Sequence, residues 1–92
     1  MYLLINFFSD LLLILWRQPH FVIGIKDQKA KLIKGKAPSG FIRNCEDIAK
    51  TAEIHQGLVL GLKRDYGIQL DFSSSIPKVN QQSFRNAWQV HS

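Results

Sequence analysis

The side chains of this chain that could do chemistry are few and widely separated. Its three histidines, His20, His55 and His91, lack the close spacing of a metal site. A single cysteine, Cys45, excludes an internal disulfide and a cysteine-based zinc site. The adjacent acids at 46–47 project in different directions from a helix and do not form a carboxylate pair. We therefore predict no catalytic residues, no metal ligands, no cofactor and no enzymatic activity.

Length and composition limit the remaining function classes. A chain of 92 residues forms at most one domain and has one small core, which excludes a large catalytic cleft between domains. Its 46% hydrophobic and 21% charged content also excludes wholesale disorder. The glycines at 35 and 40 match neither a P-loop nor a dinucleotide fingerprint. The function is therefore to be sought in surfaces.

Charge is distributed unevenly along the chain. Residues 1–16 contain no Lys or Arg and one acid, Asp10. Residues 17–92 contain all 12 basic residues and six of the seven acids, which gives this part a net charge of +6. An almost uncharged apolar segment thus leads into a basic domain, and we place the boundary between 1–18 and 19–92.

The N-terminal segment has the composition of a membrane anchor, since 13 of its first 16 residues are apolar. No basic region precedes it and no small-x-small site follows it, so it does not resemble a secretory signal. Sixteen helical residues rise about 24 Å against a hydrocarbon core of about 30 Å, a mismatch that local thinning of the bilayer can absorb. We predict that residues 1–18 form a short membrane-spanning helix.

The polar residues of this helix share one side. At 100° per residue, Asn6, Ser9, Asp10 and Arg17 fall into one stripe. In a spanning helix such a stripe should meet another helix, because polar groups in lipid seek partners. Two other interpretations remain open, a helix lying in the membrane interface and a helix buried in a soluble domain. The basic residues after the segment would face the cytoplasm.

After the anchor, the hydrophobic pattern predicts an α+β domain. Residues 20–36 alternate as a hairpin, with Phe21, Ile23 and Ile25 on one face. A helix follows Pro38, a second hairpin covers 58–72, and a closing helix follows Pro77. A ββαββα order buries its apolar positions best as a four-stranded antiparallel sheet with two helices on one face.

Each helix has a predicted buried side, and the two halves resemble each other. The buried positions are Phe41, Cys45, Ile48 and Ala52 in the first helix and Val79, Phe84, Ala87 and Trp88 in the second. Residues 23–26, IGIK, parallel residues 60–63, LGLK. This likeness has two interpretations, an internal repeat or chance between two hairpins of similar composition.

A sheet covered by helices on one side leaves its other face free. We expect that face to contain Val22, Gly24, Ile33, Val59 and Gly61. The functional interpretation is a flat docking surface with a basic edge. The alternative is an ordinary solvated face with a few aliphatic side chains.

Lysines are concentrated in the first hairpin. The candidate basic surface comprises Lys26, Lys29, Lys31, Lys34, Lys36 and, from the second hairpin, Lys63. Next to a membrane anchor, such a cluster would bind anionic headgroups. In a soluble protein the hairpin of residues 26–36 would instead bind nucleic acid, although no aromatic pair on the strands supports RNA binding. Solubilising lysines on an edge hairpin are the third interpretation.

The layout resembles a bacterial family of small proteins classed as a domain of unknown function, number 3634. The matching segments are FVI at 21–23 with the lysine-rich hairpin, PSGF at 38–41, CEDIA at 45–49, LDFS at 70–73, IP at 76–77, and QQ at 81–82 through FRN at 84–86 to Trp88. The resemblance covers roughly residues 20–90. It implies a short apolar N-terminus before the ββαββα domain and no assigned activity.

Together these features predict a non-enzymatic, membrane-anchored protein of the bacterial inner membrane. Its basic domain would face the cytoplasm and dock a protein partner, a second copy or an anionic lipid surface. The alternative is a soluble cytoplasmic nucleic-acid-binding module. No small-molecule substrate is indicated.

Overall fold

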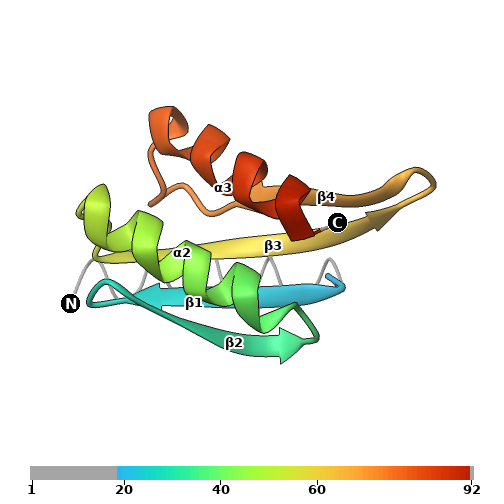
Figure 1. Cartoon of the computed structure of the whole chain (residues 1–92), viewed down its shortest axis with the longest axis horizontal. Coiled ribbons are helices and arrows are strands. Elements are labelled where there is room, and N and C mark those ends of the chain that lie inside the picture. Colours follow the sequence, from blue (N-terminus) through green and yellow to red (C-terminus); the bar gives the residue numbers. More distant parts are fainter. Residues whose placement is uncertain (1–18, 92) are drawn as a thin grey trace.

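The computed structural model describes residues 19–91, and its elements follow the predicted order (Figure 1). They are β1 (Phe21–Lys26), β2 (Lys29–Gly35), α2 (Ser39–Thr51), β3 (Gln56–Arg64), β4 (Gly67–Phe72) and α3 (Lys78–His91). The chain therefore has the predicted α+β class and the ββαββα order.

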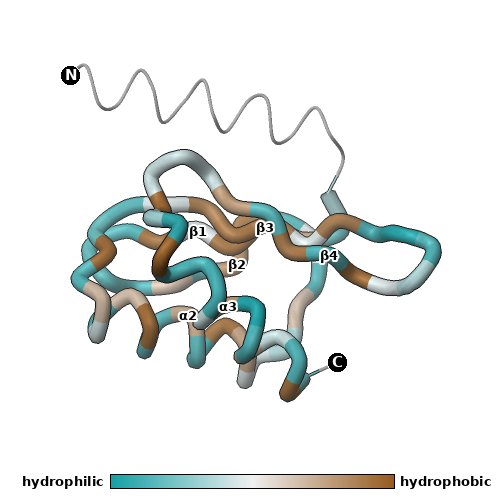
Figure 2. Tube along the Cα trace, turned by 90° about the horizontal axis from the view of Figure 1, so that it is seen from above, coloured by the Kyte–Doolittle hydropathy of each residue, from teal (hydrophilic) through white to brown (hydrophobic). Residues whose placement is uncertain are grey.

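All four strands belong to one antiparallel sheet with the order β2-β1-β3-β4. The paired strands β1 and β3 thus lie at the centre of the sheet, and β2 and β4 form its two edges. Both helices lie on the same side of the sheet (Figure 2). We call this side the helix side.

The main core lies between the sheet and the helices. Three aromatic rings meet in this core, where the partly buried Trp88 lies 5.0 Å from Phe41 and 5.4 Å from Phe21 between ring centroids. The buried members of this core are Phe21, Ile23, Ile25, Phe41, Cys45, Ala49, Ile54, Val59, Leu70, Ile76 and Phe84. Alternate residues of β1 therefore point to the helices, as their spacing predicts.

All the predicted buried positions of the two helices except Val79 pack in or against the core. In α2 the fully buried residues are Phe41, Cys45 and Ala49, whereas Ile48 is only half-buried at the margin of the core. Small side chains at 45 and 49 let the helix approach the sheet closely. In α3, Val79 is 82% exposed, because it lies five positions before Phe84 and hence about 140° away from that buried side chain around the helix.

The first hairpin closes through a two-residue turn. Asp27 and Gln28 both have positive φ angles, 52° and 64°. This is the pattern of a type I′ turn, whose twist matches that of two antiparallel strands. The backbone N–H of Asp27 also donates to the carbonyl of His55, 2.8 Å away, and so ties the turn to the segment before β3.

The predicted N-terminal helix, residues 1–18 with the polar stripe Asn6, Ser9, Asp10 and Arg17, lies outside the described residues. Within residues 19–91, neither helix is long and apolar enough to cross a membrane.

Candidate functional site

Lysines of the first hairpin project from the side of the sheet opposite the helices. Val22, Gly24 and Lys26 alternate with the core residues of β1, so they point away from α2 and α3. Residues paired across two strands project from the same side, and each of these three positions pairs with a lysine of β2. The resulting lysine face comprises Lys26, Lys29, Lys31 and Lys34 with Val22, Gly24 and Ile33.

A β-bulge completes the lysine face. Ile23 pairs with Leu32 and Val22 with Lys34, which leaves Ile33 as an extra residue in β2. Without the bulge, strict alternation would place Lys34 on the same side as Leu32, the helix side. The extra residue therefore moves Lys34 onto the lysine face.

Ile33 occupies the space above the glycine of β1. A Cβ atom on Gly24 would collide with Cδ1 of Ile33. The glycine at this position thus makes room for a neighbouring side chain of the same chain. Ile33 is still 47% exposed, so an aliphatic surface lies among the lysines.

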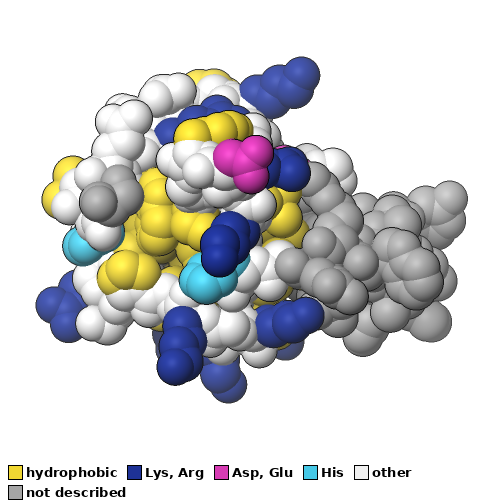
Figure 3. Space-filling model, turned by 90° about the vertical axis from the view of Figure 1, so that its right-hand side faces the viewer, with side chains coloured by type: hydrophobic (Ala, Val, Ile, Leu, Met, Phe, Trp, Pro, Cys, Tyr) yellow, Lys and Arg dark blue, Asp and Glu magenta, His cyan; other side chains and the backbone are white. Residues whose placement is uncertain are grey.

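The charges of the lysine face are poorly compensated within the described part of the chain. Lys26 pairs directly with Lys29, an arrangement that is destabilising for like charges. No ion pair within residues 19–91 involves a lysine of this face; Lys50 and Glu46, 3.5 Å apart, lie on α2. At another part of the surface, the end of the sheet where β1 begins, Figure 3 also shows more basic than acidic side chains. The lysine face therefore suits an anionic partner.

A second apolar cluster lies beside the lysines. Val22, Leu58 and Leu60 share the side opposite the helices, and each is at most 1% exposed. Leu60 pairs with Val22, and Leu58 pairs with Gly24. The sheet is therefore apolar on both sides at its centre. Val22 was predicted for the free face, but it is fully buried, so the accessible part of the lysine face consists of its lysines and Ile33.

Four predicted site residues lie elsewhere. Val59 belongs to the core on the helix side, and Gly61 lies beneath Phe21, whose ring a Cβ at this position would strike. Both were expected on the free face, and that expectation is wrong because β3 alternates in the opposite phase. Lys63 shares the phase of Val59 and also projects from the helix side. Lys36 follows the end of β2.

The alternation of β3 also decides whether the similar segments of the two halves, residues 23–26 and 60–63, are structurally equivalent. Residues 23–26 and 60–63 share their sequence pattern, but Ile23 and Ile25 face the helices whereas Leu60 lies on the opposite side. Gly24 and Gly61 therefore open space on different sides of the sheet. The likeness of these two segments is not a structural equivalence.

Cys45 and Glu46 of α2 each lie in an environment that shifts the pKa of the side chain. Burial in the core raises the pKa of the Cys45 thiol from 9.0 to about 12, so it is not a nucleophile at neutral pH. Glu46 accepts a hydrogen bond from the backbone N–H of Ala30, 3.0 Å away, which lowers the pKa of its carboxyl group. Lys50 and Lys29 lower this pKa further.

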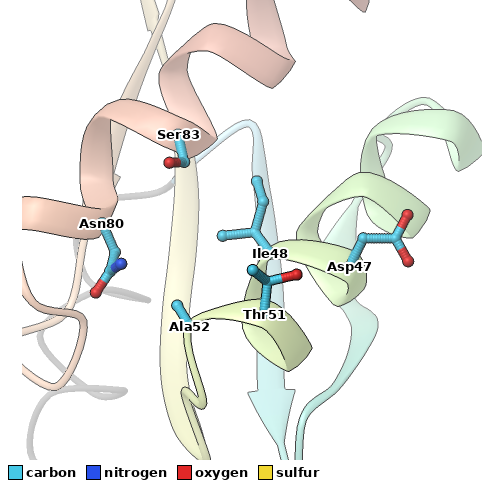
Figure 4. Close-up of a pocket in the computed structure, with 6 residues that line it drawn as sticks. All are labelled: Asp47, Ile48, Thr51, Ala52, Asn80 and Ser83. Carbon is cyan, nitrogen blue, oxygen red and sulfur yellow. The ribbon is translucent and has the colours of Figure 1, made fainter.

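The pocket between the two helices does not bring catalytic groups together. It has a volume of about 380 Å³. The pocket is lined by Ile48, Thr51 and Ala52 at the end of α2 and by Asn80 and Ser83 of α3. The carboxylate of Asp47, which also lines it, points away from the α3 residues (Figure 4). The polar groups of the pocket are therefore mainly neutral.

The three histidines remain apart. His20 and His55 are exposed near the ends of strands, and Nε2 of His91 lies 3.0 Å from Nδ2 of Asn44, which links the end of α3 to α2. Among the residues that the structure describes, no group of three or more His, Cys, Asp or Glu side chains could hold a metal ion.

The family described as "Protein of unknown function (DUF3634)" matches residues 1–92, so the chain belongs to this family. No curated protein and no solved structure matches.

Proposed function

We propose that this DUF3634 protein is a non-enzymatic, membrane-anchored protein whose lysine face rests on an anionic bilayer surface. The observation that carries the proposal is the register of β1 and β2, which puts Lys26, Lys29, Lys31 and Lys34 on one side of the sheet. Each lysine near an anionic membrane contributes about 1 kcal/mol of binding free energy. Four on one side contribute about 4 kcal/mol, a modest and salt-sensitive attraction that orients a domain already held at the membrane by an anchor.

The position of the face along the chain favours a lipid partner. β1 begins at Phe21, immediately after the apolar segment of residues 1–16 and a connection at 17–20. Four extended residues span at most about 14 Å, so an anchor in residues 1–16 would hold the hairpin close to the headgroups. In this arrangement the charge of residues 17–92 belongs on the cytoplasmic side of the bacterial inner membrane.

The chemistry of the face also suits a headgroup layer. Lysine stems are long and flexible, so the ammonium groups can reach phosphates while the stems lie along apolar surface. Ile33, 47% exposed among these lysines, offers an aliphatic side chain to the acyl boundary. The face presents no set of aromatic side chains on which nucleic-acid bases would stack.

The first test compares two charge-matched variants of the full chain. K29Q/K31Q/K34Q removes three charges from the lysine face, whereas R43Q/K63Q/K78Q removes three from elsewhere. The measurement is the ratio of partitioning onto phosphatidylglycerol-containing vesicles to partitioning onto phosphatidylcholine vesicles. We expect the first variant to lose roughly 100-fold in this ratio and the second to lose much less.

Equal losses in both variants would show that net charge alone, and not the lysine face, sets the preference. Retention of the wild-type ratio by K29Q/K31Q/K34Q, combined with salt-dependent binding of a single-stranded RNA oligonucleotide that this variant loses, would favour the nucleic-acid function instead.

The second test addresses the anchor. Full-length protein and a variant lacking residues 1–16 are fractionated from cells and washed with high salt and with alkali. We expect the full chain to stay in the membrane pellet through both washes and the shortened chain to be released by salt. Release of the full chain by salt alone would contradict a spanning anchor.

A further inference from the structure

The two edges of the sheet differ in how well they are protected from another strand. β2 and β4 each pair with one neighbour among the described elements, so each has a row of backbone groups at a sheet edge. Such an edge is a template for strand addition unless charge, a bulge or a covering element blocks it.

The β2 edge carries all three kinds of protection. Lysines occupy alternate positions, and the bulge at Ile33 interrupts the regular register. On the helix side, Oε1 of Glu46 accepts the N–H of Ala30, 3.0 Å away, so α2 occupies a donor at this edge. A second β2 strand would meet lysine with lysine.

The β4 edge has little such protection. Its register against β3 is unbroken from Gly67 to Phe72, and the strand contains no lysine, arginine or proline. The N–H of Ser73 donates to the carbonyl of Leu58, so by the alternation of an antiparallel ladder the backbone groups of Ile68, Leu70 and Phe72 point outward. One of these outward donors is occupied, because the N–H of Phe72 donates to the Oδ1 atom of Asp71, 2.9 Å away, and an added strand has to displace this carboxylate.

A groove accompanies the β4 edge on the helix side. It has a volume of about 500 Å³, with Ile68 and Leu70 on its strand wall and Arg85 and Trp88 on its α3 wall. The guanidinium carbon of Arg85 lies 5.1 Å from the centroid of the Phe72 ring. Side chains at alternate positions of an added strand would project beside α3 into this groove.

We propose that β4 is a self-association edge, at which a second copy of this chain adds its own β4 antiparallel. The two β4 strands must pair so that helix-side residues of one copy face helix-side residues of the other. A pairing centred on Leu70 meets this condition. Leu70 then faces the partner's Leu70, and Ile68 faces the partner's Phe72. Gln69 faces the partner's Asp71, so no like charges oppose each other along the strand.

A second copy fits this edge better than a charged peptide does, because the strand itself is apolar on the helix side and uncharged except for Asp71. The net charge of +5 opposes association at long range, but salt at about 0.15 M screens charges beyond about 8 Å. The contact does not depend on membrane docking, since the lysine face lies on the other hairpin.

The test uses matched substitutions on the two edges of the full chain, Ile68→Lys in β4 and Ile33→Lys in β2. Molar mass is measured by sedimentation equilibrium in a mild detergent, across the micromolar range. We expect the wild type and Ile33→Lys to form dimers, and Ile68→Lys to dissociate at least about tenfold more readily. A monomeric wild type, or equal dimerisation of both variants, would overturn the proposal.

A second measurement serves if Ile68→Lys loses the native circular dichroism spectrum. In a Cys45→Ala background, Leu70→Cys places two thiols at the symmetric centre of the contact, at a separation that a disulfide accepts. Mild oxidation with diamide should link this variant into dimers faster than a Leu62→Cys variant, whose position in β3 is equally buried but does not lie at the sheet edge. Equal rates would overturn the proposal.

Discussion

The two ββα halves share one plan but differ on their surfaces. Each contributes a hairpin, whose inner strand lies at the sheet centre, and a helix on the same side. The first hairpin carries the lysine face and a bulged, capped edge, whereas the second has a regular edge with one charged residue in its outer strand. The difference indicates a division of labour, with one half for an anionic surface and the other for association between copies.

The helices of the two halves are held differently, and this predicts the largest effect. α2 buries Phe41, Cys45 and Ala49 completely, whereas α3 buries only Phe84. Phe84→Ala should therefore lower the free energy of unfolding by about 3–5 kcal/mol and loosen α3. Cys45→Ala, which removes one sulfur from a helix with two other buried residues, should cost much less. Urea unfolding checks both.

Similar losses in these two variants would contradict the claim that Phe84, the one fully buried side chain of α3, holds its helix more strongly than Cys45 holds α2. Protection of α3 amides from hydrogen exchange in Phe84→Ala at the level of α2 would contradict it as well.

The two mid-strand glycines predict the next largest difference. A Cβ on Gly61 would strike the buried ring of Phe21, so Gly61→Ala should cost about 1–3 kcal/mol through overpacking. A Cβ on Gly24 meets the tip of Ile33, a half-exposed side chain that can rotate away. Gly24→Ala should therefore change the thermal midpoint little, and a loss equal to that of Gly61→Ala would contradict these placements.

The smallest predicted effect is the pH dependence that Glu46 adds to the first half. The N–H of Ala30 lowers the pKa of this carboxyl group below its usual 4.5. The stabilisation of the folded state by the ionised Glu46 carboxylate is therefore present above pH 4.5. It is lost as the pH falls through the lowered pKa of this group in the folded state. We expect the difference in stability between wild type and Glu46→Gln to shrink below pH 4.5. Asp47→Asn, at the neighbouring residue, is the control, and above pH 4.5 we expect its stability to differ less from that of the wild type than the stability of Glu46→Gln does.

The order of elements was predictable, but the faces of β3 were not. In β1 the alternation of Phe21, Ile23 and Ile25 with Gly24 and Lys26 identifies the buried side. β3 is buried on both sides from residue 57 to 62, so its sequence contains no polar alternation to fix the phase. The placement of Val59 and Gly61 on the free face was wrong for this reason.

The lysine cluster was visible in the sequence, but its arrangement was not. Spacing alone places Lys29 and Lys31 on one side and Lys34 on the other. Only the bulge at Ile33 brings Lys34 to the same side, and a bulge leaves no clear signal in a strand without glycine or proline at that position. The edge groove also depends on tertiary packing of α3, which periodicity does not reveal.

The most direct test of the lysine face is a footprint on the full-length protein in vesicles. Lysines are acetylated with a water-soluble reagent, and modification at each site is quantified by mass spectrometry. We expect Lys29, Lys31 and Lys34 to be protected in phosphatidylglycerol-containing vesicles relative to phosphatidylcholine vesicles, while Lys63 and Lys78 react equally in both. Equal reactivity of the first three lysines in the two membranes would contradict the proposal that this face rests on anionic lipid.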